Sequence, residues 1–298
     1  MRFRKELGEH DGLIAGDFVR NFFEFHRWEV SSLLLYIKRG PKCQGFIKYL
    51  LAHEGYRADS EQKIFRCDNT PDLYIVIMAT PDSPIVEIIN KALTTAVPTV
   101  VFHKFYPLKP FDNALGKSLR ERAKWGWTTR DMLWPDLTTR LISRKECHQI
   151  GGPSSLIIKL GNEPPGDYTP DHVLEGSVYS VVWKLMDTDR HLSVTMQPGP
   201  VSCALRYAYA NGEIGRGCKD WERFLCDRLD RWTYVEIAKM DRDQQPQGFY
   251  HMAPGNYRVR IPAGYQLPET WDYADDQIIP WFQEWEGSWT MNNQYYGR

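Results

Sequence analysis

Long apolar runs are missing from the sequence. A helix that crosses a bilayer needs about 20 consecutive apolar residues, and no stretch of this chain approaches that length. The basic N-terminus, Met1–Glu6, leads into polar sequence and not into the apolar core of a secretory signal. These two absences predict an intracellular protein of the cytoplasm that has no membrane partner.

Paired cysteines and clustered histidines are missing as well. The six cysteines are scattered without a CxxC pair, which is typical of free thiols and not of a disulfide framework. Cys147-His148 could donate to a metal, but no second pair stands at zinc spacing. The eight histidines show neither HxxxH nor HExxH spacing, so we expect no metal site.

Neither sign of charge is in excess. The chain has 37 basic and 38 acidic residues, which gives a formal net charge of -1. Binding nucleic acid through charge alone needs a basic excess, so we expect no nucleic-acid partner. The composition is 42% hydrophobic and 13% aromatic, and the length of 298 residues suits one large domain or two modest ones with a proper core.

Helix and strand patterns alternate along the first third of the chain. Apolar residues at helical spacing from Gly16 to Arg27 predict an amphipathic helix, and the apolar run 31–37 predicts a strand. Pro41 opens a further helix, and Gly55 stands where its C-terminal cap belongs. The pattern then predicts strands over 63–67 and 72–80, a helix that Ser83 caps with Pro84 in its first turn, and a strand over 97–105.

The second half has a different character. A polar helix from about Asn113 to Trp127 precedes it. Glycine- and proline-rich loops then surround strand candidates over 155–160, 191–196 and 257–261 and one good helix over 218–232. The closing segment, 271–298, carries four tryptophans, which predicts that it packs back across the body. An exposed partner-binding surface is the alternative.

The first strand region is laid out like a nucleotide-handling site, with a glycine turn, an aromatic-rich helix and then a strand. The residues concerned are Gly16-Asp17, Phe22-Phe23, Trp28-Glu29, Ser32-Leu33-Leu34 and Glu54-Gly55-Tyr56. In them the chain resembles the nucleotidyltransferase-like proteins of filamentous fungi, a branch of the polymerase-β-type superfamily. Members carry a Gly-Ser turn, a Phe-Phe helix, an Asp-Leu-Asp strand and a helix that ends in Glu-Gly-Tyr. The resemblance covers about residues 13–130.

The resemblance implies an α/β (α+β) fold in two parts. Residues 1–148 would form a nucleotidyltransferase-like domain, a mixed sheet flanked by helices. Residues 149–298 would form a C-terminal α+β region that includes the tryptophan-rich tail.

The metal-binding acids of that superfamily are replaced here. Nucleotidyl transfer uses two Mg²⁺ ions about 3.5–4 Å apart, held by two aspartates at alternate positions on one face of a strand. Those positions fall on Ser32 and Leu34. The hydroxyl of Ser32 is a weak, neutral metal ligand, and the side chain of Leu34 offers no ligand atom. Asp17 replaces the serine of the turn, where a carboxylate would repel a triphosphate. As ordinary structure, Asp17 caps a helix that begins at Phe18.

Other acids could rebuild a metal site, because geometry matters more than chain order. The candidates are Asp17, Glu29, Asp68, Asp72 and Asp82. Only such relocated carboxylates would make Mg²⁺ a cofactor; otherwise we expect none.

Two further patterns carry weaker signals. The glycine run 211–217 lacks the lysine-serine of a P-loop and the strand-to-helix context of a dinucleotide fold, so it predicts a turn. A basic-aromatic patch is the first place to look for contact with phosphate or a base, and its structural alternative is surface charge beside two core tryptophans. The patch consists of Lys117, Arg120, Arg122, Lys124, Trp125 and Trp127.

The resemblance, together with the replaced acids, implies a catalytically degenerate nucleotidyltransferase-like protein. It would act as a ligand-binding or protein-interaction module, with a small ligand or an unknown protein as partner. The candidate cleft residues are Gly16, Asp17, Glu29 and Ser32. The alternatives are an enzyme of another class that reuses the cleft on a small metabolite without two-metal chemistry, and an active nucleotidyltransferase with relocated carboxylates.

Overall fold

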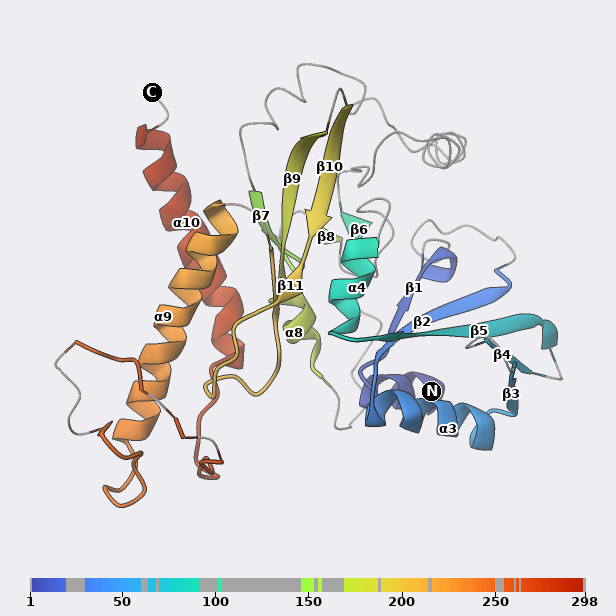
Figure 1. The fold of residues 1–298 in the computed structure, drawn as a ribbon, viewed down its shortest axis with the longest axis horizontal. Helices are drawn as coiled ribbons and strands as arrows, with labels where there is room; N and C mark the ends of the chain where they lie inside the picture. The colour runs from blue at the N-terminus through green and yellow to red at the C-terminus, as the bar shows by residue number, and fades with distance from the viewer. Residues whose placement is uncertain are drawn as a thin grey trace.

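Two sheets organise the described part of the chain (Figure 1). The computed structural model describes residues 2–19, 30–59, 64–67, 70–91, 101–102, 146–152, 155–156, 169–186, 189–213, 216–249, 255–259, 261–262 and 264–296. In these ranges the protein is a mixed α+β structure, as predicted.

The first sheet belongs to the N-terminal part of the chain. Its strands are β1 (Leu13–Ala15), β2 (Ser32–Lys38), β3 (Tyr56–Ala58), β4 (Ile64–Cys67) and β5 (Thr70–Thr80). They lie in the order β1-β2-β5-β4-β3. β2 is parallel to β5 and all other neighbours are antiparallel, so the sheet is mixed, as predicted.

One face of this sheet is covered by two helices, α1 (Arg2–Glu9) and α3 (Pro41–His53), which lie below it in Figure 1. Pro41 is in the first turn of α3, and Gly55, just past its end, has a φ of 68° that glycine adopts without strain. Both signals were predicted. Fully buried Phe46 of α3 packs with Leu35 of β2, so the odd-numbered side chains of β2 face the helices.

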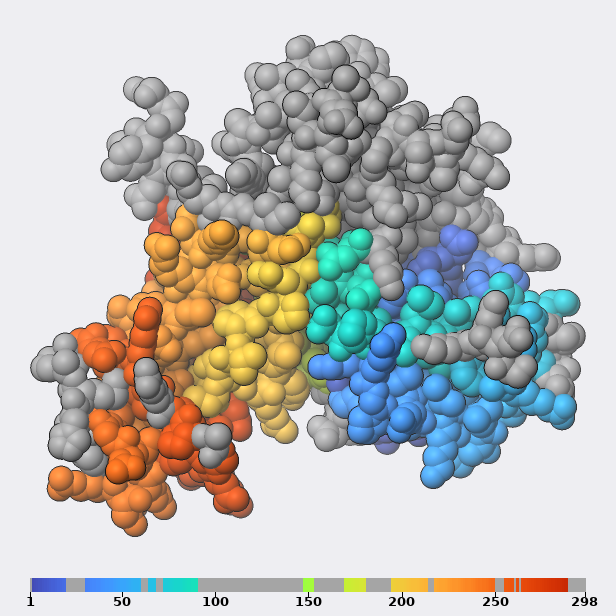
Figure 2. Space-filling model, viewed as in Figure 1, coloured from blue at the N-terminus to red at the C-terminus, as the bar shows by residue number. Residues whose placement is uncertain are grey.

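Helix α4 (Pro84–Lys91) lies between the two sheets. It begins at Pro84, as predicted, and the N–H of Val86 donates to the C=O of Ser83 at 3.0 Å. Ile88 packs on the N-terminal sheet, and Ile89 packs on the second half of the chain. Figure 2 shows the α4 residues at the surface between those of the first sheet and those that follow β10.

The second sheet has three antiparallel strands in the order β10-β9-β7. They are β7 (Glu146–Gln149), β9 (Val178–Met186) and β10 (Asp189–Thr195). Two short pairs accompany them: β11 (Gln197–Pro198) with β12 (Ala210–Asn211), and β6 (Val101–Phe102) with β8 (Ser155–Leu156). The expected domain boundary after residue 148 falls inside β7, whose partner strand β9 lies in the second half.

The second half also holds the remaining helices. They are α8 (Asp171–Glu175), α9 (Arg216–Ala238), the 3₁₀ helix η2 (Asp275–Gln277) and α10 (Ile278–Tyr296). None of the helices in the described ranges is long and apolar enough to cross a membrane.

The C-terminal segment packs back across the second half, as predicted. Trp281 and Trp285 of α10 are buried, and the ring of Trp285 lies 5.7 Å from that of Trp221 in α9. Ahead of them, the buried carboxylate of Asp275 accepts hydrogen bonds from the backbone N–H groups of Arg206 and Tyr207 at 2.8 and 3.2 Å. The tail is therefore part of the core.

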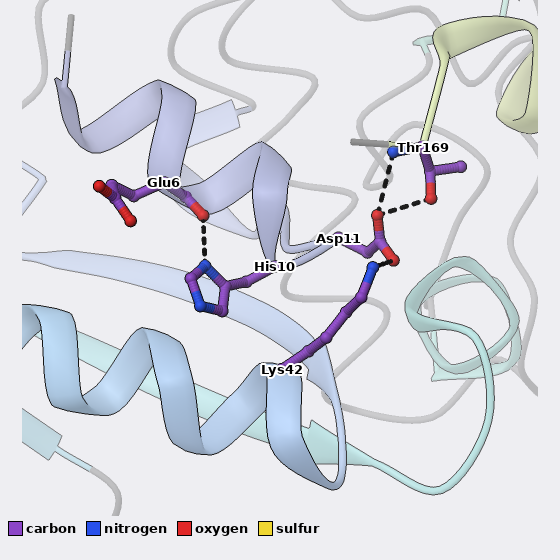
Figure 3. A network of polar contacts seen from close by, with 5 residues as sticks. All are labelled: Glu6, His10, Asp11, Lys42 and Thr169. Atoms are coloured by element: carbon purple, nitrogen blue, oxygen red, sulfur yellow. Dashed lines mark hydrogen bonds and ion pairs between the residues drawn. The ribbon is translucent and has the colours of Figure 1, made fainter. Parts of the chain in front are cut away.

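Two side chains join the halves through polar contacts. The amide of Asn90 in α4 donates to the C=O of Met196 at 2.9 Å and accepts from its N–H at 3.0 Å. Asp11 accepts hydrogen bonds from the N–H and the hydroxyl of Thr169, at 3.2 and 2.6 Å, and its other oxygen pairs with Lys42 (Figure 3). The contacts of Asn90 with Met196 and of Asp11 with Thr169 each link segments more than 100 residues apart in sequence.

Two predictions about local structure are wrong. The strand candidate over 257–261 is irregular at its described residues, because it packs on α9 and finds no partner strand. There Tyr257 meets the ring of Tyr234 edge to face, and Arg258 pairs with Asp230 at 3.4 Å. The glycine run 211–217 was expected to lack a strand-to-helix context, but β12 ends at Asn211 and α9 begins at Arg216.

Candidate functional site

Ser32 and Leu34 lie on the face of the N-terminal sheet that α1 and α3 do not cover. Their neighbours Leu33 and Leu35 join the core beneath α3, whereas Leu34 joins a separate cluster with Ile88 of α4. Alternate strand positions point to opposite faces, so Ser32 and Leu34 share one face, as predicted.

The glycine turn lies directly beside Leu34. Ala15 pairs with Leu34 across β1 and β2, and a Cβ built on Gly16 would lie 3.4 Å from Leu34 Cδ2. Gly16 has a φ of 81°, which the turn requires and glycine allows. The turn and the strand therefore lie side by side, with the side chain of Leu34 against the turn.

The surroundings of Leu34 are apolar. It packs with buried Ala15, Tyr36 and Ile88 and with half-buried Leu13 and Met78. Among the described residues, no group of three or more histidines, cysteines, aspartates or glutamates is placed to hold a metal ion.

One candidate acid in the described ranges, Asp82, lies far from Ser32. Asp17 is exposed and is the first of the described helical residues 17–19. Asp82 follows the far end of β5, where Thr80 pairs with Lys38. That pair is six positions along β2 from Ser32, or about 20 Å at a rise of about 3.3 Å per residue. Asp82 therefore cannot act beside Ser32.

Along β5, Asp72 lies nearer than Asp82 to the position that pairs with Ser32. It is exposed and lies two residues before Tyr74, the partner of Ser32, in a stretch where the pairing of β4 and β5 shifts register. The other predicted site residues lie outside the described ranges. They are Glu29, Asp68, Lys117, Arg120, Arg122, Lys124, Trp125 and Trp127.

The sequence alone did not reveal a transverse row of polar side chains on the same face. Arg57 pairs with Arg66 across β3 and β4, Arg66 pairs with Tyr74 across β4 and β5, and Tyr74 pairs with Ser32 across β5 and β2. Directly paired residues point to the same face. The sequence shows an arginine within each of two short apolar segments. That these two arginines face each other follows only from the register of the strands.

A depression lies between α1 and α3, with a volume of about 190 Å³. His10 turns one ring nitrogen, Nδ1, back to the C=O of Glu6 at 2.7 Å (Figure 3). Burial, followed by the hydrogen bond to Glu54, raises the pKa of Tyr49 well above its ordinary value. His53 lies in the last turn of α3, with its ring 5.8 Å from that of Tyr49.

The cysteines of the described ranges are free, as predicted. Cys147 of β7 packs beside the core that contains Cys218 of α9. Burial, followed by the hydrogen bond to Cys218, raises the pKa of the Cys147 thiol far above its ordinary value. A thiol in that state is a poor nucleophile and a poor metal ligand.

Comparison with known proteins adds no relative. The chain matches no protein-family model, and no significant match is found among curated proteins or solved structures. In the ranges that the structure describes, the class is therefore mixed α+β, with two larger sheets that both pack against helix α4.

Proposed function

We propose that this protein is a catalytically degenerate nucleotidyltransferase-like module that works by binding, without two-metal chemistry. The observation that carries the proposal is the contact of Leu34 with the Gly16 turn inside an apolar cluster. The binding surface is the face of β2 and β5 that α1 and α3 leave uncovered.

The chemistry of Mg²⁺ supports this reading. Mg²⁺ demands octahedral oxygen coordination and gives up its water reluctantly, so it is held by carboxylates. At the position beside the glycine turn the chain offers hydrocarbon, and taking an ion from water into such surroundings is costly. Ser32 adds one neutral hydroxyl, which cannot replace two carboxylates.

A thermal-shift screen tests the proposal. The protein is heated with ATP, CTP, UTP or GTP, each with Mg²⁺ and with a chelator. We expect any stabilisation by a nucleotide to be the same in both conditions. Stabilisation that needs Mg²⁺ would overturn the proposal.

A transfer assay with labelled nucleotides tests the relocated-carboxylate alternative. We expect no transfer by the wild type. Transfer that disappears in Asp17→Ala, Glu29→Ala or Asp72→Ala would establish an active transferase instead.

A further inference from the structure

We propose that the depression between α1 and α3 binds a small free amino acid, with the ammonium group of the ligand at Glu6 and His10 and its carboxylate at Lys48. The depression lies on the side of the N-terminal sheet that these two helices cover, opposite to the face of Ser32 and Leu34. The site is therefore separate from the surface of the proposed function, and either can fail without the other.

One face of α3 forms the floor of the depression. Gly45, Lys48, Tyr49 and Ala52 all line it, at positions i, i+3, i+4 and i+7, which share one face of a helix. The volume of about 190 Å³ corresponds to about six water molecules at about 30 Å³ each. A ligand the size of alanine therefore fits.

His10 presents one ring nitrogen as a hydrogen-bond acceptor beside this floor. Its Nδ1 lies 2.7 Å from the C=O of Glu6, so Nδ1 carries the hydrogen, and in the neutral ring Nε2 has a lone pair to accept with (Figure 3). A Cβ built on Gly45 would lie 2.6 Å from Nε2, so glycine at this position gives the ring its place against α3. Glycine inside a helix is destabilising relative to alanine, and residues that break a local rule of stability are expected at functional sites.

The two charged side chains of the depression have capacity for a ligand. The carboxylate of Glu6 contacts Arg2 only at 4.0 Å, at the surface of α1, and such a contact is weak. An ammonium group at hydrogen-bond distance would bind that carboxylate more strongly. Lys48 is exposed, and no residue that the structure describes forms an ion pair or a hydrogen bond with its side chain.

The acceptors and the cation lie on different walls. Glu6 and His10 belong to α1 and the turn after it, whereas Lys48 belongs to α3 and supplies N–H donors. A ligand with one kind of charge would satisfy one wall and oppose the other. An amino acid carries an ammonium group and a carboxylate in one small molecule, so it suits both walls, and its aliphatic part would lie on Ala52 and the ring of Tyr49.

An NMR titration of the full chain, observed on the ligand, tests the proposal with alanine as the probe. Ethylamine is alanine without the carboxylate, and propionate is alanine without the ammonium group. We expect alanine to bind at least about tenfold more tightly than either, because each lacks one set of charged hydrogen bonds. Equal binding of ethylamine or propionate would overturn the assignment to an amino acid. No binding of alanine, glycine or serine at about 10 mM would overturn the site itself.

Variants without charge assign the two ends of the ligand. Lys48→Gln and Glu6→Gln should each weaken alanine binding by about tenfold or more. The matched controls are Lys5→Gln and Glu9→Gln, which remove the same charges from α1 at residues that pair with each other outside the depression. Both controls should bind alanine like the wild type. An equal loss in variants and controls would reveal a general effect of charge and would overturn the site.

Two further variants test the imidazole, and melting temperatures show whether each is folded. Gly45→Ala should weaken alanine binding, because the added methyl group displaces the ring of His10. His10→Phe can keep the edge contact with Phe46 but removes Nε2, so it should weaken binding as well. Wild-type affinity in both folded variants would overturn the role of His10 in the site.

Discussion

The side chain of Leu34 lies against the Gly16 turn, with Ala15 and Tyr36 on its own sheet and Ile88 of α4 above it. A carboxylate at this position would lose much of its hydration and gain no cation, because its neighbours are hydrocarbon. Under the proposed function, this position is the one that carries a metal-binding aspartate in active nucleotidyltransferases. At the scale of one residue, the chemistry of the face therefore depends on this leucine.

Leu34→Asp should lower the free energy of unfolding by about 2 kcal/mol or more, since it places a charge in an apolar cluster. Urea denaturation at neutral pH measures the loss. Ser32→Asp is the matched control, because Ser32 has the same intermediate burial as Leu34 but is already polar and is not part of the apolar cluster, so stability should change by less than about 1 kcal/mol. Equal stability of Leu34→Asp and the wild type would mean that solvent reaches the position.

At the scale of elements, the helices and strands that have strong local sequence signals could be predicted from the sequence. Pro41 and Gly55 mark the two ends of α3, and the β-branched run 72–80 predicts most of β5. Strand β1 was not predicted, because three residues carry too little periodicity. The pairing of Arg57 with Arg66 was out of reach because register is set by contacts across the sheet and is shifted after Arg66.

The candidate site divides in the same way. The shared face of Ser32 and Leu34 follows from strand alternation alone, so it could be predicted. The contact of Leu34 with Gly16 needs the pairing of β1 with β2, which is not written in either segment alone. Asp82 was a candidate because the sequence does not show how far it lies from Ser32. That distance follows only from the parallel pairing of β2 with β5.

The tail element depends on one buried carboxylate. Asp275→Asn should lower the free energy of unfolding by about 1.5–3 kcal/mol, because one of the two backbone N–H donors would face an NH₂ group. The adjacent Asp276 is exposed, so Asp276→Asn should stay within about 0.5 kcal/mol of the wild type. Chemical denaturation followed by tryptophan fluorescence compares the two. Equal effects would show that Asp275 does not hold the tail.

The contact of Tyr209 with Asp275 makes the free energy of unfolding depend on pH in the alkaline range. Burial, followed by the nearby Asp275, raises the pKa of Tyr209 far above its ordinary value of 10. Its contribution is therefore fully present below pH 10 and is lost as the pH rises further, because the unfolded state then releases a proton that the folded state keeps. Tyr209→Phe should be less stable at neutral pH by about 1 kcal/mol through the lost hydrogen bond to the C=O of Asp275, and its stability should fall less steeply above pH 10. Denaturation at several pH values measures both effects; an unchanged slope would contradict the assignment.

At the scale of the whole molecule, the two sheets are joined by α4 and by the contacts of Asn90 and Asp11. Helix α4 packs on both sheets, so neither half can unfold without exposing the apolar side chains of that helix. This shared element predicts one cooperative unfolding transition. Tryptophan fluorescence reports mainly on the second half, which holds seven of the eleven tryptophans, and hydrogen exchange of α3 and β2 reports on the first.

The midpoints of the two probes in urea should therefore coincide, and Asp11→Ala should shift both by the same amount. Thr169→Val provides a matched variant, because it removes only the hydroxyl that donates to Asp11. Two separate transitions would mean that the halves are independent domains.

The central claim, that the face of β2 cannot hold a pair of divalent ions, is tested most directly by counting bound Mn²⁺. Electron paramagnetic resonance of the protein with Mn²⁺ and a non-hydrolysable ATP analogue measures both the number of ions bound and any magnetic coupling between them. The account predicts no Mn²⁺ bound to the chain beyond what the nucleotide itself carries. Two ions per chain, coupled as expected for a separation of about 3.5–4 Å, would contradict it.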